Sequence, residues 1–185
     1  MKLQQIWYIS NLLSLSRVIF LIPIYLLLKL QTAAGDYLAV FIMFMAAATD
    51  YFDGHLARKY KQRSDLGRVL DPLSDKICVL VTGLILIKIR DLPIWYFMLL
   101  VSRDLAILIF GLFLSLKMKM VMESNKIGKV TVAGLAVVLI SFTLQLEAVK
   151  WLFLWISVGL VAISSLNYLL DMVELLRKRK QFASK

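Results

Sequence analysis

The sequence predicts an all-α integral membrane protein with six transmembrane helices, forming a single domain over residues 1–185. Three observations predict this fold class. Hydrophobic residues make up 61% of the 185 residues, which is more than a water-soluble domain of this length carries. These residues gather in segments of membrane-spanning length, which short runs of Lys and Arg separate. Because hydrocarbon offers backbone groups no hydrogen-bond partner, such segments are expected to be helical.

The elements are predicted in chain order from this pattern. Residues 1–14 are expected to form an amphipathic juxtamembrane helix, with Trp7 and Tyr8 at the level of the lipid headgroups. Six apolar segments follow, each roughly 17–22 residues long, as a membrane helix requires. Their approximate bounds are 15–32, 36–56, 71–88, 93–115, 128–146 and 149–171. Small residues such as Gly134 in the fifth segment allow close helix packing.

The positions of Lys and Arg predict the orientation. Most of them lie near the N-terminus, in 58–68, in 117–129 and in 177–185, which the six spans place on one side of the membrane. Positive charge marks the cytoplasmic side, so we expect both termini in the cytoplasm and a multi-pass protein of the cell (inner or plasma) membrane. Trp95, Tyr96 and Trp151 then fall at the outer interface, where an aromatic belt is expected.

The formal net charge of +10 does not point to nucleic acid. The cations lie in short runs between apolar segments, an arrangement typical of membrane topology and of contact with anionic lipid headgroups.

Four aspartates stand where apolar segments meet basic residues. Asp50 and Asp53 are three residues apart at the end of the second segment, and Asp71 and Asp75 are four apart at the start of the third. Each pair therefore shares one helix face. Carboxylates at a membrane edge are costly, and several together need compensating charge. Mg²⁺ or Mn²⁺ prefers such oxygen ligands, and two ions are the natural arrangement for displacement at phosphorus.

The residues around the aspartates suit a phosphate-bearing ligand. Gly54, Ala57 and Gly67 leave room for a bulky group, and Arg58 has the fork geometry that matches phosphate oxygens. The alternative is purely structural pairing of an aspartate with a cation such as Lys76. Four acids at this spacing, together with the small residues and Arg58, favour the functional interpretation.

The segment from Asp50 to Asp75 resembles the signature of the CDP-alcohol phosphotransferases, D-x-x-D-G-x-x-A-R, eight residues, G-x-x-x-D-x-x-x-D, at every fixed position. The resemblance implies transfer of a phosphatidyl or similar group from a CDP-linked donor, such as CDP-diacylglycerol, to an alcohol, with release of CMP. It implies a homodimer and a general base at Asp75. It implies metal ligands at Asp50, Asp53, Asp71 and Asp75. It implies CDP contacts at Asp50, Gly54, Ala57, Arg58 and Gly67.

The acceptor alcohol is less sharply predicted. The stretch Leu70–Lys76 is similar to the branch that contains phosphatidylglycerophosphate synthases and cardiolipin synthases. Arg103 lies inside the fourth segment, where a guanidinium either pairs with Asp104 or a metal-site carboxylate, or faces a cavity and binds an acceptor phosphate. Lys126 and Lys129 either reach the same phosphate or anchor their helix at the interface.

These cations favour a small phosphorylated alcohol, most simply glycerol 3-phosphate, with phosphatidylglycerol as the alternative acceptor. A second functional class, a divalent-cation transporter, would also place carboxylates in helices. Transporters hold such groups near the bilayer midplane, whereas these lie at one edge.

Overall fold

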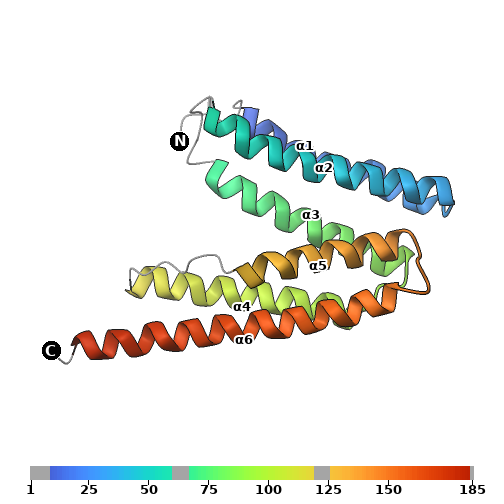
Figure 1. Cartoon of the computed structure of the whole chain (residues 1–185). Coiled ribbons are helices and arrows are strands. Elements are labelled where there is room, and N and C mark those ends of the chain that lie inside the picture. The colour runs from blue at the N-terminus through green and yellow to red at the C-terminus, as the bar shows by residue number, and fades with distance from the viewer. Residues whose placement is uncertain (1–8, 60–66, 119–125, 184–185) are drawn as a thin grey trace. The chain divides into compact units, whose positions relative to one another are not determined.

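The structure of the chain is a computed structural model. It describes the backbone of residues 9–59, 67–118 and 126–183, and the side chains of residues 17–49, 74–109 and 127–173. Six helices and no strand occur in the described backbone, which confirms the all-α prediction (Figure 1). The helices are α1 (Ile9–Lys29), α2 (Ala33–Lys59), α3 (Gly67–Ile89), α4 (Ile94–Met118), α5 (Lys126–Thr143) and α6 (Lys150–Ala183).

Each predicted span corresponds to one helix, but several helices extend further than the apolar segments. α1 begins at Ile9, so residues 9–14 continue directly into the helix of the first predicted span. Residues 1–8 lie outside the described part of the chain, and a separate juxtamembrane helix stays a prediction. α6 continues to Ala183 because the residues after the apolar segment are Leu, Glu, Arg and Lys, which favour helix as strongly as the residues before them.

Three helices end at a non-glycine residue with a left-handed backbone. The φ angles are 51° at Gln31 after α1, 54° at Asp91 after α3 and 49° at Gln145 after α5. A left-handed residue at this position turns the chain out of the helix and exposes the last carbonyls to new donors. After α5, the Leu146 N–H donates to the carbonyl of Ser141 at 3.0 Å, which is the long bond of the Schellman motif. The turns thereby end helices without a glycine.

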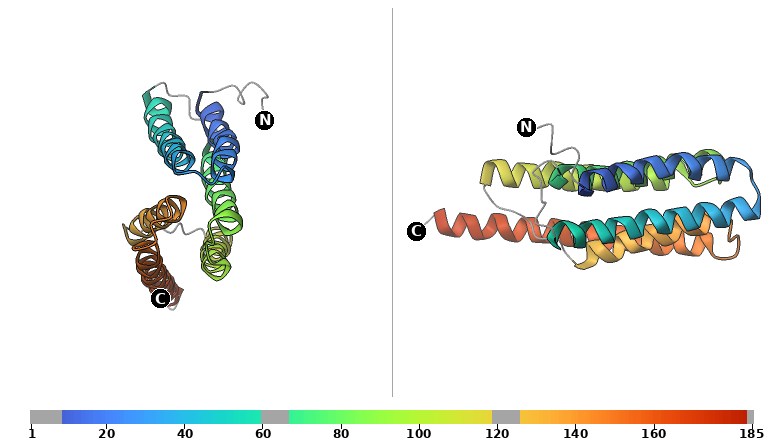
Figure 2. Two further views of the ribbon diagram at one scale, coloured as in Figure 1. Left: turned by 90° about the vertical axis from the view of Figure 1, so that its right-hand side faces the viewer. Right: turned by 90° about the horizontal axis from the view of Figure 1, so that it is seen from above.

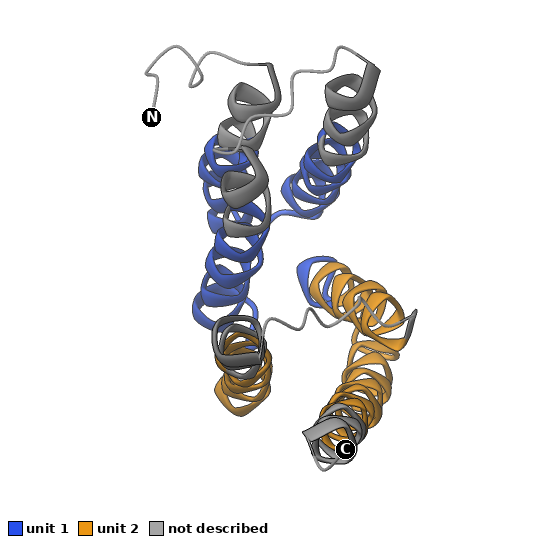
Figure 3. Cartoon of the chain, turned by 90° about the vertical axis from the view of Figure 1, so that its left-hand side faces the viewer, with its two compact units in different colours: residues 1–92, 142–145 blue, residues 93–141, 146–185 orange. Residues whose placement is uncertain are grey.

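The chain divides into two compact units, residues 1–92 with 142–145, and residues 93–141 with 146–185 (Figure 3). In the first unit, α1 packs against both α2 and α3. α1 and α2 run antiparallel beside each other (Figure 2). Gly35 permits this approach, because a Cβ atom there would lie 2.8 Å from the Leu27 carbonyl oxygen. The buried apolar residues of α1 are Leu21, Ile24 and Leu28.

A buried ion pair joins α2 to the end of α3 in the first unit. The Nη2 atom of Arg90 contacts Oδ1 of Asp36, and the two side chains are only 3% and 11% exposed. Asp36 lies in the first turn of α2, and Arg90 follows the last turn of α3. Each charge therefore also interacts favourably with the helix dipole at its own end. Neither charge would be stable there alone.

In the second unit, α6 contacts both α4 and α5. The hydroxyls of Tyr96 on α4 and Ser157 on α6 form a buried hydrogen bond of 2.7 Å. The Thr131 hydroxyl of α5 shares its proton between the Ile127 carbonyl of its own helix at 2.9 Å and the Leu160 carbonyl of α6 at 3.3 Å. At Gly134 a Cβ atom would lie 2.9 Å from Cδ1 of Leu160, so the glycine lets α5 and α6 approach closely.

The aromatic belt is corrected at Tyr96. Trp95 and Trp151 are exposed, as a belt requires, but Tyr96 is fully buried. The cause is its hydroxyl, which finds a partner in Ser157 and therefore allows the whole side chain to enter the protein interior.

The apolar character of the described helices is consistent with a membrane protein. Residues Lys150–Val173 of α6 form a helix long and apolar enough to cross a bilayer. Ala33–Thr49 and Ile127–Thr143 are shorter apolar helices among the residues searched. Large apolar side chains such as Ile22 on α1 and Trp155 on α6 are more than half exposed, which suits contact with lipid rather than with water.

The ion pair between Asp36 and Arg90 predicts a stability effect. Asp36→Asn removes one charge and leaves the other buried without compensation, which typically costs about 3–5 kcal/mol. We expect a clearly lower thermal unfolding midpoint for the purified variant in detergent micelles. Asp91→Asn is the matched control, because Asp91 is exposed and asparagine tolerates its left-handed backbone. Equal midpoints for the two variants would contradict the structural role of the pair.

Candidate active site

The predicted base, Asp75, is held by an arginine of another helix. Asp75 lies on α3, and its Oδ1 atom forms an ion pair with Nη1 of Arg17 on α1. The Asp75 side chain is 50% exposed, whereas that of Arg17 is 4% exposed. The carboxylate is therefore half exposed, whereas the guanidinium with which it pairs is buried.

The other three predicted metal ligands lie on the same two helices as expected from their spacing. Asp50 and Asp53 are in α2, and Asp71 is in α3. Helical backbone keeps each close pair on one helix face. Their side chains are outside the described residues, so metal binding by the four carboxylates stays a prediction.

The predicted CDP contacts also fall on helical backbone. Gly54, Ala57 and Arg58 lie in the last part of α2, and Gly67 is the first residue of α3. Nothing is described of their side-chain surroundings. Their role in nucleotide binding therefore stays a prediction, and so does that of Asp50.

Among the residues whose side chains are described, no three His, Cys, Asp or Glu residues come together as a metal site. This set contains only Asp75 of the four predicted ligands. The chemistry of the donor set still fits the predicted ions, because an ionised carboxylate has about four lone-pair sites.

Arg103 has the partner that the sequence offered as one alternative. Its Nη1 atom donates to Oδ1 of Asp104 at 3.1 Å, and its Nη2 atom donates to the Ser164 hydroxyl of α6 at 2.8 Å. The buried Nε atom of Arg103 has no hydrogen-bond partner among the described residues. One donor of the guanidinium is therefore left for a ligand or a water molecule.

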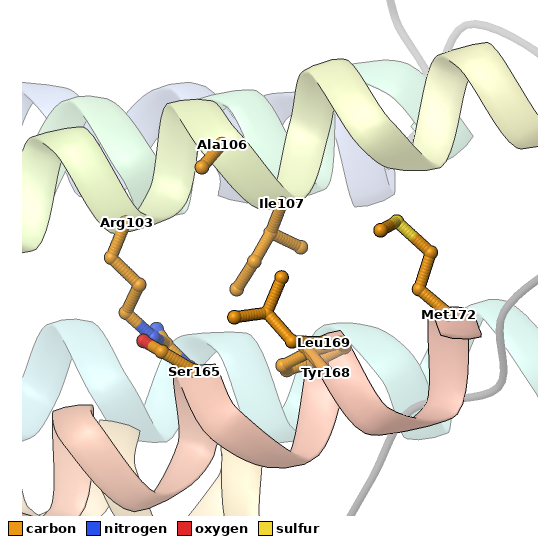
Figure 4. Close-up of a pocket in the computed structure, with 7 residues that line it drawn as sticks. All are labelled: Arg103, Ala106, Ile107, Ser165, Tyr168, Leu169 and Met172. Atoms are coloured by element: carbon orange, nitrogen blue, oxygen red, sulfur yellow. The ribbon is translucent and has the colours of Figure 1, made fainter. Parts of the chain in front are cut away.

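A cavity of about 140 Å³ lies between α4 and α6 beside this arginine (Figure 4). Its lining is mainly apolar, and Arg103 brings the one full charge among the residues that line it. They are Arg103, Ala106, Ile107, Ser165, Tyr168, Leu169 and Met172. Pairing with Asp104 and facing a cavity are therefore not exclusive for Arg103. The cavity can accept a small anionic group at its arginine end.

The two lysines predicted near the acceptor differ in what the structure describes. Lys126 is the first residue of α5, and its side chain is outside the described residues. Lys129 is exposed and is not among the residues that line the Arg103 cavity. Lys129 therefore does not line the cavity beside Arg103.

Arg17 pairs with the predicted base Asp75, but the sequence does not predict it as a site residue. It stands within the apolar α1 and is followed by Val18, Ile19 and Phe20. The argument applied to Arg103, that a guanidinium in an apolar helix needs a partner, applies equally to Arg17. Its partner could not be read from the sequence, because 58 residues separate it from Asp75.

Comparison with known proteins gives a consistent family. The sequence profile described as CDP-alcohol phosphatidyltransferase matches residues 7–163. A Bacillus subtilis (strain 168) protein named CDP-diacylglycerol--glycerol-3-phosphate 3-phosphatidyltransferase is 31% identical over 180 residues, which cover 86% of this chain and 92% of that protein. A protein of the same name from Aquifex aeolicus (strain VF5) is 38% identical over 138 residues, or 72% of this chain and 74% of the relative.

A relative with another name matches a shorter region. The "Cardiolipin synthase (CMP-forming)" of Streptomyces coelicolor is 35% identical over 105 residues. This match covers 55% of the chain and 48% of the relative, so it spans about half the length of that protein.

Proposed function

The chain belongs to the CDP-alcohol phosphatidyltransferase family, and from this we propose that it transfers the phosphatidyl group of CDP-diacylglycerol to glycerol 3-phosphate and releases CMP. It is a transferase of phospholipid biosynthesis. The observation that carries the choice of acceptor is the long match to two relatives named for glycerol 3-phosphate, which covers 72% and 86% of this chain. The complete donor signature between Asp50 and Asp75 supports the choice of donor.

In the proposed reaction, Asp75 takes the proton from the acceptor hydroxyl. The acceptor oxygen then attacks the phosphorus that carries the diacylglycerol, and the bond from that phosphorus to the oxygen of CMP breaks. Half exposure of the carboxylate suits this role, since a general base must come within hydrogen-bond reach of the proton that it removes.

The metal requirement is part of this proposal. Asp50, Asp53, Asp71 and Asp75 supply only hard oxygen donors, which fit two Mg²⁺ or Mn²⁺ ions better than softer metals. When bound, such ions neutralise the charge of the diphosphate and of the departing CMP. Asp50, Gly54, Ala57, Arg58 and Gly67 would hold the CDP moiety, with Arg58 directed to phosphate by its fork of donors.

We place the acceptor phosphate at Arg103, with Lys126 and Lys129 as further cations of the same side. The remaining Nε donor of Arg103 and the adjoining cavity support this position. Phosphatidylglycerol is the second candidate acceptor, because the Streptomyces coelicolor relative carries the name of a cardiolipin synthase. Both acceptors contain a phosphate, so the arginine alone does not separate them.

We further propose six spans in the cell membrane, with both termini and the active site on the cytoplasmic side and a homodimer as the assembly. The bias of Lys and Arg towards one side supports the orientation. The apolar α6 and the exposed apolar surfaces support insertion in a bilayer. Membership of the family favours phosphatidyl transfer over divalent-cation transport.

An acceptor panel tests the function directly. Purified protein should release CMP from CDP-diacylglycerol in the presence of Mg²⁺ or Mn²⁺, and fastest with glycerol 3-phosphate. Phosphatidylglycerol, inositol phosphate, inositol and serine are the competing acceptors, and mass spectrometry identifies the lipid product. Preference for phosphatidylglycerol would replace the first acceptor by the second. No release with any alcohol would refute the enzyme.

Asp75→Asn is the control for this assay. The amide keeps the shape of the side chain but cannot accept the proton, so CMP release should fall to a trace that is measurable only with enzyme in excess. The purified variant should still be folded and monodisperse, with a lower thermal midpoint because the buried Arg17 loses its compensating charge. Near-normal activity in this variant would remove Asp75 from the catalytic role.

Arg103→Ala tests the acceptor site. A charge-assisted hydrogen bond contributes about 1.5–3 kcal/mol, so the KM for glycerol 3-phosphate should rise about tenfold or more, with little change in the KM for CDP-diacylglycerol. Ser102→Ala is the matched control, since Ser102 is exposed on the same helix and donates only to the Leu99 carbonyl. Equal increases in both KM values for Arg103→Ala would argue against the acceptor role.

A further inference from the structure

We propose that Arg17 is a positioning residue, which holds the Asp75 carboxylate in the orientation needed to take a proton from the acceptor. The inference rests on the proposed function, because it assigns Arg17 a task only if Asp75 is the base. It starts from the ion pair between Nη1 of Arg17 and Oδ1 of Asp75, which joins α1 to α3.

The arginine is fixed by the packing of its own helix. Arg17, Leu21, Ile24 and Leu28 follow one another at helical spacing along α1, and all four are buried. They form a single stripe on the face of α1 that packs within the first unit. The guanidinium therefore extends a packed apolar stripe instead of facing lipid, and the surrounding side chains restrict its rotamers.

The burial of the two partners is very unequal, and this separates their tasks. Arg17 is 4% exposed and Asp75 is 50% exposed. A ligand that approaches the carboxylate therefore meets Asp75 first, with the guanidinium behind it. The burial of Arg17 places it behind the carboxylate, so we expect its contribution to the reaction to pass through Asp75.

The other buried ion pair of the first unit provides a comparison. Arg90 is as deeply buried as Arg17, but its partner Asp36 is only 11% exposed. Both ends of that pair are closed, as a purely structural link requires. The Arg17–Asp75 pair is closed on the arginine side and open on the acid side. This difference indicates that the Arg17–Asp75 pair positions a carboxylate that must remain accessible.

Arginine suits this task better than lysine would. Its planar guanidinium presents donors in a rigid fork, so it fixes the direction of a carboxylate as well as balancing its charge. Proton transfer depends strongly on geometry, and a displacement of about 1 Å at a reacting group can cost about a hundredfold in rate. Loss of the arginine should therefore lower turnover without removing any substrate contact.

Steady-state kinetics of Arg17→Gln and Arg17→Lys test the proposal, with wild-type CMP release from CDP-diacylglycerol to glycerol 3-phosphate measured first. We expect kcat to fall about a hundredfold in Arg17→Gln, with both KM values near those of the wild type. The kcat of Arg17→Lys should lie between those of the wild type and of Arg17→Gln, because lysine keeps the charge but lacks the fork of donors. A thermal unfolding midpoint is measured for every variant.

Arg90→Gln is the matched control, because it also breaks a buried Arg–Asp pair of the first unit. It should lower the thermal midpoint while kcat, measured well below that midpoint, stays close to wild type. A wild-type kcat in Arg17→Gln would overturn the proposal. So would a kcat that falls with the thermal midpoint equally in both variants, or a raised KM at unchanged kcat. Failure of the wild type to release CMP would instead defeat the proposed function from which the inference starts.

Discussion

The need to pair buried guanidinium groups shapes what is described of this protein. Arg17, Arg90 and Arg103 all place their side chains among apolar helices, where an uncompensated charge is costly. Each forms an ion pair with an aspartate: Arg17 with Asp75, Arg90 with Asp36, and Arg103 with Asp104. In the first unit these pairs join different helices, so satisfying a charge also fixes which helices lie together.

The same requirement links the fold of the first unit to its chemistry. α3 is tied to α1 by Asp75, and the residue that follows α3, Arg90, ties it to α2. The two ties lie 15 positions apart, or about 22 Å along a helix at 1.5 Å per residue. The two ion pairs join α3 to two different helices of the first unit. General-base catalysis requires a carboxylate that is held in a fixed position and can reach the proton, and Asp75 on α3 suits this requirement.

The sequence predicts the helices of this fold but not which helices contact one another. Apolar segments and their spacing are local, so six helices and the shared face of Asp71 and Asp75 could be inferred. The partners of Arg17 and Arg90 could not, because a periodic pattern shows which residues share a face but not which helix that face meets. Tyr96 was misplaced for a similar reason, since Ser157 lies 61 residues away. For Arg103 the sequence offers one of its two partners, because Asp104 is its neighbour in the chain whereas Ser164 is not.

The central claim is that Arg17 and Asp75 act as one unit in phosphatidyl transfer, and the double variant tests it most directly. The measurement is the rate of CMP release, with enzyme in excess over CDP-diacylglycerol, for Asp75→Asn with and without Arg17→Gln. If the arginine works only through the carboxylate, the second substitution has nothing left to disturb, and the two rates should be equal. If the losses multiply, Arg17 contributes independently of Asp75, and the account is contradicted.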